Sequence, residues 1–158
     1  MAVNAYLVLE GIDGPSKSKK KAIDIMSFSF ATSNSAMISQ ASGGELKAGK
    51  ANFADLSVMK VLDKTSPDLW AHCVKATFVK KVEIFYDKEI DEKHEDYFKI
   101  ELVDALITSI QLSGSSEHPM ESVTFTYSKV KVSYNPEDDG KLAGFIDRGF
   151  DVQTLEKW

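Results

Sequence analysis

Residues 50–76 have the sequence KANFADLSVMKVLDKTSPDLWAHCVKA, which passes from a strand-like segment into the segment of this chain most typical of a helix. Ser66 is a favourable N-cap residue, and Pro67 follows at the first helical position, where its missing N–H costs nothing. Asp68 adds a negative charge near the positive end of the helix dipole. The stretch therefore predicts a short helix over about residues 66–76, with Ser66 as its cap.

The predicted helix is amphipathic. Leu69 and Cys73 are four residues apart, as are Trp70 and Val74, so these four side chains would form one broad apolar stripe. A helix of about ten residues is not stable alone in water. We therefore expect it to pack against the rest of the chain.

Most of the remaining chain is typical of strands. Residues 3–10 alternate between apolar and polar side chains, and residues 98–112 and 123–134 form two long runs in which this alternation changes phase. The first run changes phase at Asp104. Long strands of this kind usually bend at bulges, and a bent strand can serve two sheets. The predicted fold is mainly β: a bent antiparallel β-barrel or two-sheet sandwich with one short flanking helix.

Three further segments complete the predicted architecture. In residues 22–33 large apolar side chains share one face of a strand and small side chains share the other. The large ones are Met26, Phe28 and Phe30, and the small ones are Ser27, Ser29 and Ala31. Residues 34–49 lack periodicity and predict a long extended loop, which a partner would order. Residues 87–96, DKEIDEKHED, predict a solvated turn.

Composition limits the possible functions. The 158 residues include 19 basic and 24 acidic side chains, and 43% are hydrophobic, which fits a single domain over residues 1–158. The formal charge of −5 argues against binding nucleic acid or an anionic membrane surface. Neither a membrane-spanning run nor a signal peptide is visible, so we expect synthesis in the cytoplasm and no membrane insertion. Cys73 is the only cysteine, which excludes an internal disulfide.

Catalytic and cofactor motifs are not apparent. His72 and Cys73 are adjacent, and His94 and His118 lie in charged or turn segments, so no metal-ligand spacing is present. The chain carries no nucleophile elbow, no phosphate-binding glycine loop and no dinucleotide fingerprint. We therefore expect no cofactor, no metal and no enzymatic activity.

Four segments resemble a known family in their order and spacing. The chain opens with MAVNAYLVLEGIDGPS, continues with AIDIMSFSF and KANFADLSVMKVLDKTSPDLW, and later carries VTFTYSKVKVSYNPED. Together they resemble the haemolysin-coregulated protein (Hcp) family, the tube protein of bacterial type VI secretion, over nearly the whole chain. The resemblance implies hexameric rings that stack into a hollow tube and are expelled from the cell. It also implies the sheath, the spike and effectors as partners.

The resemblance assigns roles to two segments. The small side chains Ser27, Ser29 and Ala31 become candidates for the wall of the lumen. The loop 34–49 becomes a candidate contact between protomers or rings. Its expected anchors are Met37, Ile38 and Leu46, and its expected turn is at Gly43 and Gly44.

Other functions remain open from the residues alone. The alternative is a monomeric β-sandwich module that binds a ligand or carbohydrate on an exposed face bearing aromatic side chains. A hydrolase would need a carboxylate pair assembled from different strands, because Glu101 and Asp104 would face opposite sides of one strand.

Overall fold

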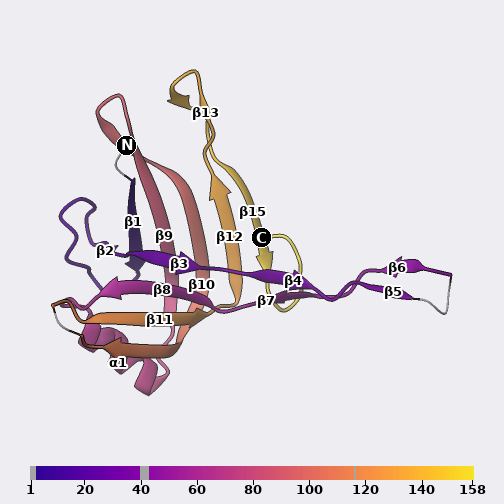
Figure 1. Cartoon of the computed structure of the whole chain (residues 1–158), viewed down its shortest axis with the longest axis horizontal. Coiled ribbons are helices and arrows are strands. Elements are labelled where there is room, and N and C mark those ends of the chain that lie inside the picture. The colour runs from indigo at the N-terminus through magenta and orange to yellow at the C-terminus, as the bar shows by residue number, and fades with distance from the viewer. Residues whose placement is uncertain (1–2, 40–42, 116) are drawn as a thin grey trace.

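Antiparallel strands make up most of the fold in the computed structural model, which describes residues 3–39, 43–115 and 117–158 (Figure 1). One helix occurs among these residues, α1 (Ser66–Lys75). The strands before it are β1 (Val3–Leu9), β2 (Ile23–Asp24), β3 (Ser27–Ser29), β4 (Thr32–Asn34), β5 (Met37–Ser39), β6 (Glu45–Lys47), β7 (Ala51–Phe53) and β8 (Leu56–Val61). Those after it are β9 (Val79–Ile90), β10 (Lys93–Ser113), β11 (Met120–Thr126), β12 (Lys129–Tyr134), β13 (Glu137–Asp138), β14 (Lys141–Leu142) and β15 (Ile146–Asp151).

Strand β10 bends and belongs to two sheets. Its first half pairs with β9 and β12, and its second half, from Leu106 onward, pairs with β11. At the bend Asp104 has a φ of 50°, and the register with β11 shifts between Ile107 and Ser109. The break in alternation predicted at Asp104 therefore lies at the bend, just before the register shift with β11.

The bend divides the strands into a first sheet, ordered β2-β1-β9-β10-β12-β15, and a second sheet, ordered β10-β11-β8-β3. Two other places carry the chain from one sheet to the other. Strands β11 and β12 are joined at Tyr127 and Ser128. Between β2 and β3, Ile25 donates its N–H to Ala5 in the first sheet, and Met26 donates to Met59 in the second. The predicted mainly β fold with two sheets and a flanking helix is confirmed.

The hydrophobic core lies between the inner faces of the two sheets. In the second sheet, Leu56, Val58, Val123 and Phe125 are fully buried, and in the first sheet Leu7, Val82, Ile84, Ile100 and Leu102 are buried against them. Phe28 and Phe30 pack against this core as predicted, with Phe28 at 5.5 Å from the Tyr86 ring centroid. Met26 does not, because it lies at the corner between the sheets and is 59% exposed.

The start of α1 differs from the prediction. Thr65, not Ser66, occupies the N-cap position, and no side chain caps the helix there. The Ser66 hydroxyl is turned toward two buried charged residues, Lys60 and Glu121, and it also accepts the Asp63 N–H at 3.1 Å. Ser66 does not cap the helix because its hydroxyl is already used in hydrogen bonds to the buried ion pair.

The predicted apolar stripe of α1 is mostly not covered by the body. Leu69 is fully buried and Cys73 is half-buried, but Trp70 and Val74 are 55% and 65% exposed. Only Leu69 and Cys73 pack toward the core. Trp70 and Val74 lie beside them on the helix and face away from the core. Trp70 and Val74 thus form an apolar surface that this chain does not bury.

Residues 34–49 are extended, as expected, but they are not without secondary structure. Strands β4 and β7, then β5 and β6, form a two-stranded ribbon that projects far from the body (Figure 1). We call this projection, residues 32–53, the arm. Most of its described side chains are exposed, although Phe53 at its base packs against the core, so the ribbon produces no apolar alternation in the sequence.

Residues 87–96 are strand ends and not a solvated turn. Strand β9 continues to Ile90 and β10 begins at Lys93, which leaves Asp91 and Glu92 as a two-residue connection. Both have positive φ, 50° and 63°, as a type I′ hairpin turn requires. The sequence signal was weak because neither residue is the glycine or asparagine that such turns usually contain.

Candidate functional site

The outer face of the second sheet consists of uncharged side chains, most of them serine or threonine. Because Leu56 and Val58 point into the core, the alternate residues of β8 point outward, and the ladders place matching residues of β3, β10 and β11 beside them. We call this surface the serine face. Its members are Ser27, Ser29, Ser57, Met59, Val61, Ser109, Gln111, Ser113, Met120, Ser122 and Thr124.

The register arranges the serine face in rows across the strands. The row nearest the arm contains only hydroxyl side chains: Ser29, Ser57, Thr124 and Ser109. Ser57 and Thr124 are linked there by a hydrogen bond of 3.2 Å between their hydroxyl oxygens. The predicted residues Ser27 and Ser29 lie on this face, and Ala31 follows just beyond β3; all three are exposed. The prediction identified one strand of a surface that spans four.

The outer face of the first sheet is charged instead. Lys99 contacts Glu83 at 2.8 Å and Glu101 at 3.5 Å, and Lys81 contacts the same two carboxylates at 3.6 and 3.5 Å. Burial lowers the pKa of Lys99, but its hydrogen bond to Glu83 and the charges of Glu83 and Glu101 outweigh burial, so the pKa lies above its ordinary value. The two outer faces therefore differ sharply in charge.

The arm carries apolar side chains away from the core. Met37 is 69% exposed and Leu46 is 73% exposed, and in the ladder Ile38 is the partner of Leu46. Gly43 and Gly44 both have positive φ, 77° and 88°, at the start of the returning strand. A two-stranded ribbon is marginally stable in water, so exposed apolar side chains on it indicate a partner surface.

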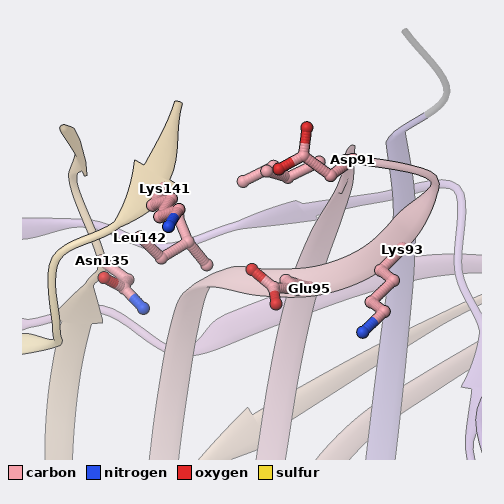
Figure 2. Close-up of a pocket in the computed structure, with 7 residues that line it drawn as sticks. Asp91, Lys93, Glu95, Asn135, Lys141 and Leu142 are labelled. Atoms are coloured by element: carbon pink, nitrogen blue, oxygen red, sulfur yellow. The ribbon is translucent and has the colours of Figure 1, made fainter. Parts of the chain in front are cut away.

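A cleft of about 680 Å³ lies between the β9–β10 hairpin tip and the β13–β14 hairpin (Figure 2). Its lining mixes charges of both signs with two aliphatic side chains: Ile90, Asp91, Lys93, Glu95, Asn135, Lys141 and Leu142. Figure 2 shows Asp91, Lys93 and Glu95 on one side of it and Lys141, Leu142 and Asn135 on the other. The aromatic side chains expected of the alternative carbohydrate module are not among these lining residues, so the cleft does not favour that function.

A buried ion pair lies under the start of α1. Lys60 donates to Glu121 and, at 3.2 Å, to the Val61 carbonyl, and Ser66 donates to the Glu121 carboxylate at 3.1 Å. Both charged side chains have no exposed surface, which makes the pair a structural element inaccessible to substrate. The sequence does contain a signal for this burial. Lys60 follows Leu56 and Val58 at alternate positions of one strand, so it shares their inward face. Sequence reasoning missed both residues.

Other kinds of site receive no support from the described part of the chain. No group of three or more His, Cys, Asp or Glu side chains lies together there in a way that could hold a metal. Within the same residues no helix is long and apolar enough to cross a membrane. The serine face and the exposed apolar side chains of the arm are therefore the surfaces that a function must account for.

Comparison with known proteins identifies the family. Residues 6–134 match the family model described as "Type VI secretion system effector, Hcp". Protein hcp1 of Pseudomonas aeruginosa is 30% identical over 157 residues, covering 97% of both chains. The chain therefore belongs to the Hcp family, the tube proteins of type VI secretion.

Solved structures agree with this fold. A type six secretion system protein superposes with a TM-score of 0.89 at 27% identity, over 99% of this chain and 100% of that one. Hcp1 from Salmonella typhimurium superposes with a TM-score of 0.81 at 23% identity, over the full length of both chains. The second relative supports the fold alone.

Proposed function

We propose that this protein is a structural subunit that forms closed rings of six, which stack into the hollow, expelled tube of a type VI secretion system. Each subunit is one domain over residues 1–158, and the lumen carries or protects effectors. The partners are other copies of the chain, the sheath and spike, and effectors; neither nucleic acid nor a membrane is among them. Family membership supports this proposal, and so does the contrast between the two outer faces.

The serine face, with Ser27 and Ser29, is the proposed lumen wall, extended by Ala31. A tube that passes varied proteins needs clearance, which small side chains provide. It also needs a wall that neither traps nor repels cargo by charge, because six copies multiply any charge around the channel. By the same argument, the outer face of the first sheet, with the ion pairs of Lys81, Glu83, Lys99 and Glu101, is the proposed outside of the tube.

The arm is the proposed contact between protomers or rings. Met37, Ile38 and Leu46 would be its apolar anchors, and Gly43 and Gly44 would provide the turn. Interfaces gain most of their binding energy from a few anchors of this kind, while the polar remainder forms the rim. Ser66 is not part of the arm, and its hydroxyl contacts the buried residues Lys60 and Glu121.

Substitution within the serine face tests the proposed lumen. Ser29→Arg should leave folding and ring formation intact and abolish co-purification of a co-expressed type VI effector, since a long cation would occupy the channel. Ser128→Arg, at an exposed position between β11 and β12, is the matched control and should retain the effector. Unchanged effector recovery with Ser29→Arg would place this face on the outside of the ring.

A further inference from the structure

Helix α1 presents an apolar surface that the body leaves uncovered. Trp70 and Val74 lie one turn apart on the same helix face and are 55% and 65% exposed. Phe78, which follows just after the helix, is 65% exposed. We call Trp70 and Val74 the helix patch. Large apolar side chains grouped on the surface usually mark a contact with another protein.

A separate apolar groove lies at the base of the arm. It has a volume of about 400 Å³ and runs between strands β4 and β7 on one side and β12 and β15 on the other. Its apolar lining comprises Phe30, Phe53, Val130, Val132, Phe150 and Leu155. Phe150 and Leu155 at its mouth remain 36% and 37% exposed. We call this feature the arm-base groove.

The patch and the groove lie on different flanks of the molecule. Helix α1 is at the lower left of Figure 1, whereas β4, β7, β12 and β15 are to its right. One surface is a protruding helix face and the other is concave, so they are complementary in shape and in apolar character. A surface that pairs with a different surface of an identical copy makes a heterologous contact, which closes into a ring when the rotation allows it.

Three other surfaces already have assignments under the proposed function, on which this inference rests. The serine face would line the lumen, the charged face of the first sheet would be outside, and the arm would extend to a neighbour. A ring also needs two different lateral surfaces on each subunit, one for each adjacent copy. The helix patch and the arm-base groove are two apolar surfaces on different flanks that have no other assignment, and they suit this role.

We propose that the helix patch of each subunit docks into the arm-base groove of the next subunit around the ring. Trp70 is the principal anchor, since aromatic side chains seated in pockets dominate interface energies. Val74 packs beside it. Every subunit uses both surfaces once, so neither the helix patch nor the arm-base groove stays exposed after the ring has closed.

Mixing two defective variants tests this contact. Trp70→Glu with Val74→Glu removes the helix patch and keeps the groove, whereas Phe150→Glu removes the groove and keeps the patch. Leu155→Glu is a second groove variant at an exposed position, in case Phe150→Glu disturbs packing. Lys75→Glu, an exposed change elsewhere on α1, is the control and should assemble like the parent.

Each defective variant alone should be a monomer. An equimolar mixture should form a one-to-one dimer with twice the 17.5 kDa protomer mass, because exactly one intact patch meets one intact groove and neither chain can extend further. A mixture that stays monomeric while the parent forms rings would overturn the contact and leave the proposed function standing. Rings formed by either variant alone would overturn it too. A parent that is itself monomeric would instead contradict the proposed function.

Discussion

Lys60 and Glu121 are opposite charges in a fully buried position at the end of the core. They are cross-strand partners on β8 and β11, and Glu121 Oε2 has no hydrogen-bond partner among the described residues. Removing two charges from water is costly, and their attraction offsets that cost only while both are present. The pair therefore joins β8 to β11 beneath α1 without adding much net stability.

Single and double substitutions should separate these effects. Lys60→Met leaves an uncompensated buried carboxylate and should lower the free energy of unfolding by about 3–5 kcal/mol. Lys60→Met combined with Glu121→Leu should restore most of that loss, since well-packed apolar side chains replace the pair. Denaturant unfolding at neutral pH measures both. A double variant no more stable than the single one would mean that the charges themselves hold α1 in place.

Tyr127 connects the corner between β11 and β12 to the chain before β8. Its hydroxyl donates to the Ala54 carbonyl at 2.7 Å, and burial together with the nearby Asp55 raises its pKa from 10.0 to about 12. A raised pKa means that the folded state holds this proton after the unfolded chain has lost it. The stabilising contribution is complete below pH 10.0 and is lost as the pH rises toward about 12.

Comparison with Tyr127→Phe isolates this contribution. The variant should be about 1 kcal/mol less stable at neutral pH, because it lacks the hydrogen bond to Ala54. Its free energy of unfolding should then fall less steeply than that of the parent above pH 10.0. Unfolding curves collected from neutral pH to pH 11.5, roughly, provide the comparison. Parallel pH profiles would mean that Tyr127 titrates normally in the folded protein.

At the scale of elements, the arm is made of regularly paired strands but has no hydrophobic core of its own among its described residues. Its strands pair along β4–β7 and β5–β6, yet Met37 and Leu46 remain exposed. A ribbon of this kind contributes little to the stability of the body. Under the proposed function, its exposed apolar side chains contact another copy of the chain.

Replacing residues 36–48 with a short Gly-Ser connector should therefore affect assembly and not folding. The midpoint of thermal unfolding should change little, because loop-closure entropy varies slowly with length. Ring or tube assembly, measured by sedimentation, should weaken markedly. A shortened protein that sediments and stacks like the parent would show that the arm is a passive connector.

The elements also show what the sequence could and could not predict. The bend at Asp104 was predictable, because the alternation of apolar and polar residues breaks there. The arm was missed as a hairpin because its strands bury no common face. The turn predicted over residues 87–96 was too long, because charged residues on both sides of Asp91 and Glu92 belong to the β9–β10 ladder, which residue preference alone did not indicate.

The candidate site was predictable only in part for a related reason. Ser27 and Ser29 could be recognised within one strand, but Ser57, Ser109 and Thr124 join them only through long-range strand pairing. The assignment of Ser66 as the cap was wrong. Local residue preference favours serine at that position, but the Ser66 hydroxyl instead forms hydrogen bonds with Lys60 of β8 and Glu121 of β11. Family resemblance supplied the role of the surface, which residue patterns alone did not.

At the scale of the whole molecule, distinct surfaces face different directions. The serine face is neutral, the outer face of the first sheet is charged, and the helix patch and arm-base groove are apolar. A monomeric protein has no need for two separate unburied apolar surfaces and a projecting arm. A closed ring uses all of them.

The native mass of the purified protein tests the central claim most directly. Native mass spectrometry across a range of concentrations should show one dominant species at six times the 17.5 kDa protomer mass, with few intermediates, because ring closure satisfies every lateral surface at once. Lys75→Glu should give the same species, and Trp70→Glu with Val74→Glu should give monomers. A parent protein that remains a 17.5 kDa monomer at every concentration would contradict the account.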